Sequence, residues 1–360
     1  MIKLNQIKSK TIIRGLLLGF ISFLGALLFT AFFIIKITYA KYQTFLSASQ
    51  LSNDQLISLI KRVDRNPSTK PTTFLILGID ETENRPDFPQ LTDTMMLLKV
   101  DPQIAKITAL SLPRDLWSEE YQTKINALYE YGRQRDPNDP TSFPKTIIED
   151  LTQQEIGHTL TISLDQLGKI IDMLGYISIE VKDGFVDERF PRSDVDITTE
   201  RDPEKLYETV VFEPGLQQMD STLALKYIRS RNSSNLDNGT DQARNLRQQQ
   251  VISAIINKLS NPQLYWHNPH IAGELLSFYQ DEFDQYLPLE QAISLAISIV
   301  RAGSALSINS VSLPISTLNE VGVIEHPNNL RPYQNQWVYI IKDREIFIEF
   351  IDQAMTEDKN

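Results

Sequence analysis

The stretch that decides the fold is Thr73-Phe-Leu-Ile-Leu-Gly-Ile-Asp80. A short, continuous apolar run of this kind is typical of a strand that is buried on both faces of a sheet. The run ends in a carboxylate, so the residue that closes the strand can also take part in chemistry. We therefore expect a central β-strand with Asp80 at its carboxyl end.

Two further strands are predicted over residues 94–100 and 106–112. Asp93 precedes the first of them and Arg114 follows the second. If the three strands run up, down and up, these two residues and Asp80 share one edge of the sheet. Ligands usually bind at such edges in open α/β sheets. For each residue alone, the alternative is a solvated loop charge, but three together favour a site.

Helical and strand patterns alternate along the rest of the chain. Helices are expected over residues 122–134, 144–156, 164–174, 216–228, 241–259, 271–285, 288–301 and 343–355, and strands over 177–182, 307–313 and 337–341. Strands that are interleaved with helices indicate an α/β fold. We expect an α-β-α layered domain whose central mixed sheet is flanked by helices.

The N-terminal region carries an uncharged run from Gly15 to Ile35. At about 1.5 Å per residue, this run is long enough to cross a hydrocarbon core of roughly 30 Å. More basic residues precede the run than follow it, which predicts a cytoplasmic N-terminus. A cleaved signal peptide is the alternative. It is disfavoured because the run is long and the region around Ala40 makes a poor cleavage site.

These patterns divide the chain into four parts. They are a cytoplasmic N-terminus (1–14), a transmembrane helix (15–38), a juxtamembrane helix and linker (39–71) and one extracytoplasmic domain (72–360). A helix is expected over 41–63, and the composition of residues 66–71 is that of a linker. Within the domain, residues 72–260 form the core, and residues 261–360 carry no motif and are expected to pack against it.

The charge of the chain narrows the function. Residues 42–360 hold 29 basic and 46 acidic side chains, because the first 41 residues contain six Lys or Arg and no Asp or Glu. Broad nucleic-acid binding needs a basic face, so this negative body argues against it. The chain has no cysteine, which excludes disulfides and thiolate metal sites.

Four arginines nevertheless crowd into one short stretch: Arg229, Arg231, Arg244 and Arg247. Guanidinium groups are always charged and fork onto phosphate oxygens. On the predicted helix 241–259, two of these arginines and Gln248 share the face that continues with apolar residues, so they should point inward near the helix N-terminus. This arrangement indicates an anion site. The alternative is a buried ion-pair network with Asp220, Asp237 or Asp241.

The two halves combine into one hypothesis. Two carboxylates and several arginines suit a diphosphate whose charge is shared with a hard divalent ion, Mg²⁺ or Mn²⁺, held by Asp80 and Asp93. Either aspartate could instead act as a base on an acceptor hydroxyl. The chain has no Gly-x-x-x-x-Gly-Lys loop, so a nucleotide is not indicated.

Several motifs resemble those of the LytR-CpsA-Psr family of cell-envelope phosphotransferases. They are Phe74-Leu-Ile-Leu-Gly-Ile-Asp80, Thr92-Asp-Thr-Met-Met-Leu97, Leu110-Ser-Leu-Pro-Arg-Asp115, Lys124-Ile-Asn126, Phe212-Glu-Pro-Gly215, Ala224-Leu-Lys-Tyr-Ile-Arg-Ser-Arg231 and Asp241-x-x-Arg-x-x-Arg-Gln248. Their order and spacing carry the resemblance, which covers roughly residues 72 to 260 and agrees with a single N-terminal anchor.

The resemblance implies a fold that binds a polyprenyl pyrophosphate, with the lipid tail between the sheet and the helices. It implies that Asp80 and Asp93 ligate Mg²⁺, that Arg114 and Arg244 take part in catalysis with them, and that Lys124 lies nearby. The residues that it places on the pyrophosphate are Arg114, Lys124, Arg229, Arg231, Arg244, Arg247 and Gln248. The implied reaction transfers a glycopolymer phosphate from its lipid carrier to a sugar hydroxyl of peptidoglycan.

Two other functions remain open. One is hydrolysis of polyprenyl pyrophosphate, with water in place of the sugar. The other is a non-catalytic protein that binds lipid or polymer and regulates envelope assembly. Supplying an acceptor glycan separates transfer from hydrolysis, and metal-dependent turnover separates both from simple binding.

Overall fold

The structure of the chain is a computed structural model that describes residues 2–64, 70–79, 89–192, 195, 200–231, 240–302, 306–317 and 320–356. The chain divides into two compact units. The first comprises residues 1–56 and 263–277, and the second comprises residues 57–262 and 278–360.

A five-stranded sheet with the strand order β11-β3-β2-β1-β6 forms the centre of the second unit. Its strands are β1 (Thr72–Ile79), β2 (Thr92–Asp101), β3 (Lys106–Leu112), β6 (His158–Ser163) and β11 (Ser307–Ser312). β2 is antiparallel to β1 and to β3, whereas β6 runs parallel to β1 and β11 runs parallel to β3. The predicted mixed sheet, and the up, down and up course of the first three strands, are therefore confirmed.

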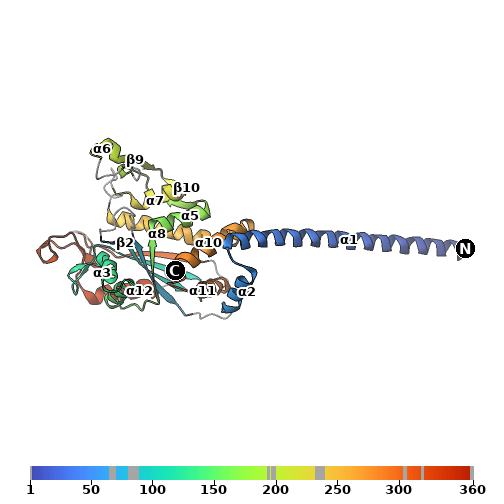
Figure 1. The fold of residues 1–360 in the computed structure, drawn as a ribbon, viewed down its shortest axis with the longest axis horizontal. Helices are drawn as coiled ribbons and strands as arrows, with labels where there is room; N and C mark the ends of the chain where they lie inside the picture. The colour runs from blue at the N-terminus through green and yellow to red at the C-terminus, as the bar shows by residue number, and fades with distance from the viewer. Residues whose placement is uncertain are drawn as a thin grey trace. The chain divides into compact units, whose positions relative to one another are not determined.

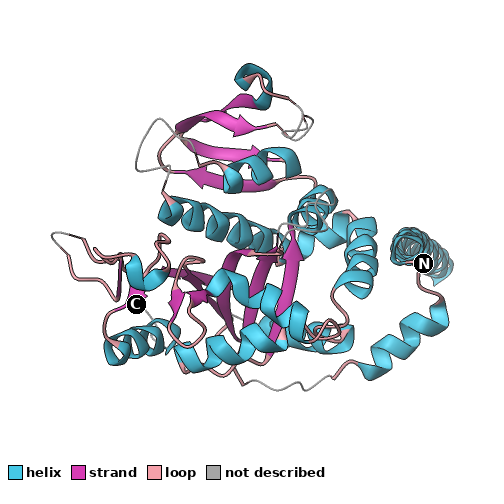
Figure 2. Ribbon diagram, turned by 60° about the vertical axis from the view of Figure 1, so that its left-hand side comes forward, coloured by secondary structure: helices cyan, strands magenta, loops and turns pink. Residues whose placement is uncertain are grey.

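β1 is buried on both faces, as its apolar run predicts. Leu75 and Leu77 belong to a core shared with α3 (Leu128–Arg135), α4 (Ser142–Thr152) and α12 (Arg344–Thr356). Phe74 points to the other face, where it joins a second core shared with α8 (Asp241–Leu259) and α11 (Leu289–Arg301). Helices thus cover both faces of the sheet, in the α-β-α layers that the sequence predicts (Figure 2).

Two antiparallel ribbons and their helices add a smaller layer. β7 (Ile177–Val181) pairs with β10 (Gly215–Met219), and β8 (Phe185–Pro191) pairs with β9 (Tyr207–Phe212). The helices here are α5 (Leu164–Leu174), α6 (Pro203–Leu206) and α7 (Ser221–Arg229). Helix α8 contacts both β7 and the central sheet, so it lies between the ribbon and the sheet.

Short elements complete the second unit. They are β4 (Trp117–Ser118), β5 (Thr123–Lys124), η1 (Ile125–Ala127), β12 (Ile324–Glu325), η2 (Arg331–Tyr333) and β13 (Ile340–Ile341). The helix predicted over 122–134 therefore begins only at Leu128, after β5 and η1. The strand predicted over 337–341 is reduced to β13. Strands β4, β6, β8, β9 and β12 were not predicted.

The helix predicted over 216–228 is wrong in its first part. Leu216 and Met219 lie in β10, and the helix begins at Ser221. Asp220 separates the two elements, since its Oδ1 accepts a hydrogen bond from Leu223 N at 2.8 Å and so caps α7. Pairing with β7 and this cap outweigh the helical spacing of the apolar residues.

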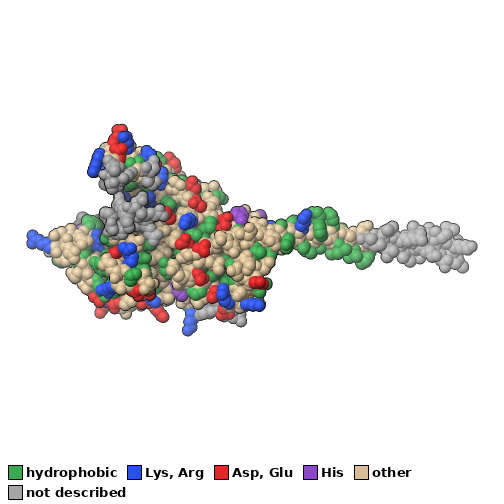
Figure 3. Space-filling view, viewed as in Figure 1, with side chains coloured by type: hydrophobic (Ala, Val, Ile, Leu, Met, Phe, Trp, Pro, Cys, Tyr) green, Lys and Arg blue, Asp and Glu red, His purple; other side chains and the backbone are tan. Residues whose placement is uncertain are grey.

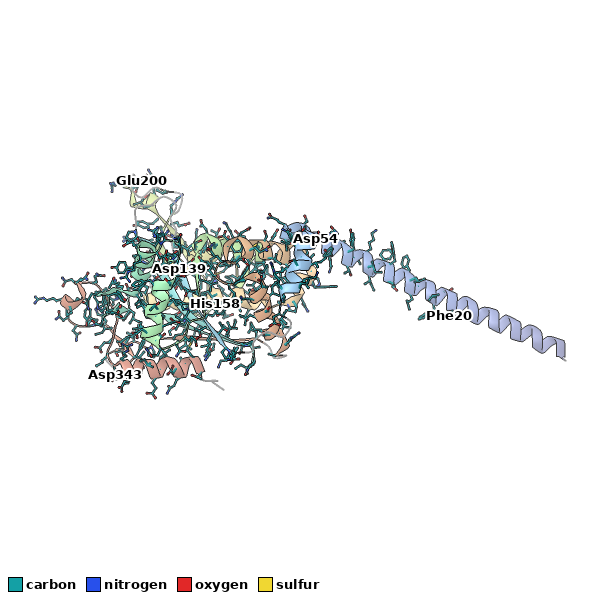
Figure 4. All side chains as sticks on the ribbon, turned by 60° about the horizontal axis from the view of Figure 1, so that its bottom comes forward. Phe20, Asp54, Asp139, His158, Glu200 and Asp343 are labelled. Atoms are coloured by element: carbon teal, nitrogen blue, oxygen red, sulfur yellow. The ribbon has the colours of Figure 1, made fainter. Side chains whose placement is uncertain are left out.

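The first unit contains the long helix α1 (Ile2–Ser49), which is drawn in blue in Figure 1. Its residues Ser22–Ser49 are long and apolar enough to cross a membrane. Apolar side chains lie along the described part of the helix on the face that Figure 3 shows, and Phe20 projects from it in Figure 4. An N-terminal apolar helix is therefore present, as predicted.

Helices α2 (Asn53–Arg62), α9 (Pro262–His267) and α10 (Pro269–Glu282) belong wholly or partly to this first unit. The helix predicted over 41–63 is thus divided between α1 and α2. Gly273 of α10 packs closely on α1, because a Cβ at this position would lie 2.5 Å from Phe45 O. Lys41 Nζ lies 4.1 Å from the ring centroid of Trp266, so α9 is also tied to α1.

Candidate active site

A β-bulge places Asp93 at the edge of the central sheet. Gly78 pairs with Thr94 and Ile79 pairs with Thr92, so Asp93 is an extra residue between two registered pairs. A bulge bends its strand and redirects a side chain, and bulges are frequent beside active sites. Gly78 leaves no room for a side chain, because a Cβ there would lie 2.8 Å from Thr94 Cβ. The two strands thus approach closely where Asp93 stands out of the ladder.

Asp93 contacts guanidinium groups from two distant parts of the chain. Arg114, just after β3, donates a hydrogen bond from Nη1 to Asp93 Oδ1. Arg231 Nη2 lies 3.7 Å from the same oxygen. The Asp93 side chain is 40% exposed, so a ligand can reach this cluster. Asp80, the other predicted carboxylate, lies outside the described residues.

Lys124 pairs with a carboxylate that the sequence reading did not include in the site. Its Nζ lies 2.6 Å from Asp115 Oδ1, while Arg114 Nε lies 3.5 Å from Asp115 Oδ2. Asp115 is buried and joins the two basic side chains. Its position directly after Arg114 was the signal that could have found it. The predicted contact between Lys124 and pyrophosphate stays a prediction.

The arginines at the end of α7 and just after it contact residues of β8. Arg231 N donates to Asp187 Oδ2 at 3.0 Å, and Asp187 is fully buried. The guanidinium carbon of Arg229 lies 5.7 Å from the ring centroid of Phe190, within the range of a cation–π contact. The sequence reading missed Asp187 and Phe190 because it assigned no strand to this segment.

Helix α8 carries a buried basic and polar face at its N-terminal end. Thr240 caps the helix, because its Oγ1 accepts a hydrogen bond from Ala243 N at 3.1 Å. The predicted inward orientation is confirmed by the low exposure of five residues on this face: Arg244 (2%), Arg247 (4%), Gln248 (8%), Val251 (0%) and Ile255 (6%). Two guanidinium groups are therefore held inside the protein, close to the N-terminus of the helix.

Arg247 holds the C-terminal end of α7. Its Nε donates to Tyr227 O at 2.9 Å and its Nη2 donates to Ser230 O at 2.5 Å. Burial lowers the pKa of Arg247, while the charges of Tyr227 and Asp187 act in the opposite direction. These contacts give Arg247 a role in positioning the segment that carries Arg231. Its predicted contact with pyrophosphate stays a prediction.

The alternative of a buried ion-pair network takes a different form from the one expected. Asp220 caps α7, and Asp237 and the side chain of Asp241 lie outside the described part of the structure. The carboxylate whose charge acts on Arg247 is that of Asp187. Buried charge in α8 is therefore balanced in part by an acid from β8.

An apolar cavity of about 490 Å³ lies between the sheet and the helices α5 and α8. Its lining changes along each element. On β2 it passes from Asp93 and Thr94 to Met96 and Leu98, and on α8 it passes from Arg244 and Gln248 to Val251, Ile252, Ile255 and Ile256. Arg244 and Ile256 are about 18 Å apart along the helix. Arg229 and Arg231 also line the cavity, so apolar walls end at a group of cations.

This arrangement defines an α/β domain that suits an amphiphile with a long apolar tail and an anionic head. The chain belongs to the LytR-CpsA-Psr family, because residues 35–343 match the model of that family.

Two relatives share about a quarter of their aligned residues with this chain. The chain is 24% identical over 276 residues to the polyisoprenyl-teichoic acid–peptidoglycan teichoic acid transferase TagU of Oceanobacillus iheyensis, a match that covers 76% of this chain and 72% of that protein. It is 28% identical over 233 residues to the corresponding transferase TagV of Bacillus subtilis, across 62% of this chain and about half (53%) of TagV.

Solved structures agree on the fold. The structure of TagT bound to LIIa-WTA superposes with a TM-score of 0.52 at 18% identity, and covers 81% of this chain and 92% of TagT. A likeness at this level of identity establishes the fold. The roles of the individual site residues therefore depend on the geometry described above.

Proposed function

We propose that this protein is a membrane-anchored phosphotransferase that moves a glycopolymer from a polyprenyl-pyrophosphate carrier to peptidoglycan. The observation that carries the proposal is the apolar cavity that ends at Asp93, Arg231 and Arg244. The relatives named above as polyisoprenyl-teichoic acid–peptidoglycan teichoic acid transferases support the same reaction class.

In this proposal the prenyl tail occupies the apolar part of the cavity. Its diphosphate then lies among the guanidinium groups of Arg229, Arg231 and Arg244, which line the cavity. Arginine forks match phosphate oxygens, and their attraction for phosphate is stronger where water is excluded. Arg114 contacts Asp93 and would complete the cluster from the side of the sheet.

The proposed transfer is a substitution at phosphorus. An acceptor hydroxyl oxygen forms a bond to the phosphorus next to the glycan, and the bond from that phosphorus to the bridging oxygen breaks. The prenyl monophosphate leaves, and the hydroxyl proton passes to a carboxylate of the site or to water. The arginines stabilise the charge that spreads over the phosphoryl oxygens in the transition state.

A divalent ion, Mg²⁺ or Mn²⁺, is part of the proposal. Among the described residues, no group of three or more His, Asp or Glu side chains lies together to hold a metal. Mg²⁺ is, however, commonly held by one or two carboxylates together with substrate phosphates and water. Asp93 is partly exposed beside the cavity, and Asp80 follows β1 directly in the chain, so these two residues would hold it. The ion would neutralise diphosphate charge.

The proposed location is the cell membrane, with the N-terminus in the cytoplasm and the catalytic domain outside. It rests on the apolar helix and on the excess of basic residues that precede its uncharged run.

A cavity-filling variant tests the lipid site. Ile252 lines the cavity, whereas Leu246, on the same helix, is 47% exposed. In the full-length protein in nanodiscs, we expect Ile252→Trp to weaken binding of a synthetic prenyl diphosphate at least tenfold and to leave inorganic pyrophosphate binding unchanged. Leu246→Trp should behave as the parent protein does. Equal prenyl diphosphate affinity in all three proteins would exclude the cavity as the lipid site.

A turnover assay tests the reaction. We expect a purified lipid-linked glycan to be joined covalently to added peptidoglycan, with loss of activity in EDTA and recovery with Mg²⁺ or Mn²⁺. Release of the glycan phosphate at equal rates with and without an acceptor would instead identify a hydrolase. Tight binding without turnover would identify a regulator, and transfer that EDTA does not affect would exclude the metal.

A further inference from the structure

An exposed aromatic side chain is rigidly presented on the loop between β12 and β13. The rings of Trp337 and His326 stack with centroids 3.5 Å apart and an angle of 22° between their planes. His326 Nδ1 lies 2.9 Å from Val338 O, which fixes the supporting ring. Trp337 is nevertheless 53% exposed. The protein thus supports one face of an indole while much of its surface remains in solvent.

The loop is joined to the candidate active site through its backbone. Tyr339 N donates to Asp115 O at 2.9 Å, and Trp117 N donates to Tyr339 O at 2.8 Å. Residues 337–339 therefore run beside the segment that follows Arg114. The rings of Trp337 and Tyr339 meet edge to face, with their centroids 6.4 Å apart. A surface loop that is held against a site in this way is a common means of binding substrate.

A second, much smaller hollow lies between this loop and the arginines. Its lining includes Arg114, Asp115, Arg244 and Tyr339. Arg244 also lines the large apolar cavity. One guanidinium group thus borders both spaces, with the proposed lipid on one side and the aromatic loop on the other.

This placement matters for the geometry of the proposed transfer, on which the inference rests. In phosphoryl transfer the attacking oxygen and the leaving oxygen are roughly in line through phosphorus. If the prenyl phosphate leaves toward the apolar cavity, the attacking hydroxyl must come from the other side of the diphosphate. Arg114 and Tyr339 line the small hollow and are not among the residues that line the large cavity, so this hollow offers a second approach to Arg244.

We propose that Trp337 is a stacking platform for a sugar ring of the acceptor glycan. A pyranose ring has an apolar face of C–H groups that packs on an indole, while its hydroxyls hydrogen-bond to neighbouring polar groups. Gln334 and Gln336, whose side-chain amides lie 3.2 Å apart, come just before Trp337 and supply such groups. A large amphipathic ring system with few rotatable bonds is well suited to this kind of contact.

The experiment compares two exposed tryptophans in the full-length protein in nanodiscs. Trp266 is 62% exposed and lies in the first unit, so Trp266→Ala is the matched control for Trp337→Ala. With soluble peptidoglycan glycan strands as acceptor, we expect Trp337→Ala to raise the KM for acceptor about fivefold to tenfold. The kcat and the affinity for prenyl diphosphate should stay unchanged, Trp337→Phe should recover part of the loss, and Trp266→Ala should have no effect.

A binding titration without donor separates this inference from the proposed function. If the parent protein binds the glycan strands and Trp337→Ala binds them less tightly, the platform stands even if no turnover is found. If transfer proceeds and Trp337→Ala leaves the KM for acceptor unchanged, the platform is excluded while the transferase stands. Two other results would also overturn it. One is that Trp337→Ala loses donor and acceptor affinity equally. The other is that Trp337→Ala loses binding to protein-free lipid vesicles while its binding to glycan is unchanged.

Discussion

Arg231 Nη2 lies 3.7 Å from Asp93 Oδ1, which joins the edge of the central sheet to the segment after α7. Both side chains are about half exposed, at 45% and 40%. Ion pairs with this exposure contribute roughly 0–1 kcal/mol to stability. The contact therefore adds little stability, and under the proposed function a phosphate of the ligand replaces the carboxylate as the partner of Arg231.

Replacing Asp93 tests the acid of the site. We expect Asp93→Ala to lower transfer by about 10²-fold or more, because the substitution removes a charged group from the site of reaction. The fold should be retained, since Asp93 stands outside the registered pairs of the sheet. Steady-state transfer and circular dichroism check the two parts, with Asp93→Asn as the isosteric control. A fully active Asp93→Ala protein would contradict the assignment.

Replacing Arg244 tests the cation that lines both hollows. We expect Arg244→Ala to weaken prenyl diphosphate binding about 10- to 100-fold, since hydrogen bonds to charged groups contribute roughly 1.5–3 kcal/mol. Titration of the purified full-length protein gives the dissociation constant. Arg344→Ala, at an exposed position on α12, is the control. Unchanged affinity in the Arg244 variant would show that this arginine does not contact the ligand.

Replacing Arg247 should lower the stability of the fold, whereas replacing Arg244 should lower the affinity for the ligand. Arg247→Ala leaves two backbone carbonyls, those of Tyr227 and Ser230, without their guanidinium donor. Each buried group that loses its partner costs roughly 1–3 kcal/mol, so we expect a clear fall in the melting temperature. The measurement is the melting temperature of Arg247→Ala, compared with those of the parent protein and of Arg244→Ala. A normal melting temperature together with lost diphosphate affinity would place Arg247 on the ligand instead.

The shifted pKa of Glu130 predicts how the free energy of unfolding changes at acidic pH. Burial alone raises the pKa of this carboxyl. Hydrogen bonds from Gln134, Gln90 N and Arg133 together lower it by more than burial raises it, so the pKa lies below the ordinary value of 4.5. A depressed pKa contributes stability above the unfolded-state value, and this contribution is lost as the pH falls through the folded-state value.

We therefore expect Glu130→Gln to be less stable than the parent protein near neutral pH. The difference should shrink as the pH falls below about 4.5. Free energies of unfolding by urea, measured for both proteins across this range, give the result. A difference that stays constant with pH would show that the carboxylate charge does not matter.

The sequence predicts the parts of the fold that depend on local periodicity. Helices α5 and α8 have the expected bounds. Apolar residues recur on one face of each helix with helical spacing, and a capping side chain marks the N-terminus of each. The buried strand β1 followed from its apolar run. Leu216 and Met219 have helical spacing too, yet they form β10, since pairing with β7 is not visible in local sequence.

The candidate site was predictable to the extent that strand direction brings residues together. Asp93 and Arg114 follow from three alternating strands. Asp115 and Asp187 do not, because an acid becomes part of a site only through its tertiary neighbours, here Lys124 and the backbone of Arg231. A cavity between the sheet and the helices was implied by the family resemblance alone, since its walls come from elements that are far apart in the chain.

The bulge at Asp93 suggests a way to inactivate this protein by deleting a single residue. Because the sheet holds its register on either side of this residue, a chain shortened by Asp93 alone could close the ladder without moving a core side chain. Under the proposed function, we expect such a deletion to abolish transfer while binding of the prenyl diphosphate is retained.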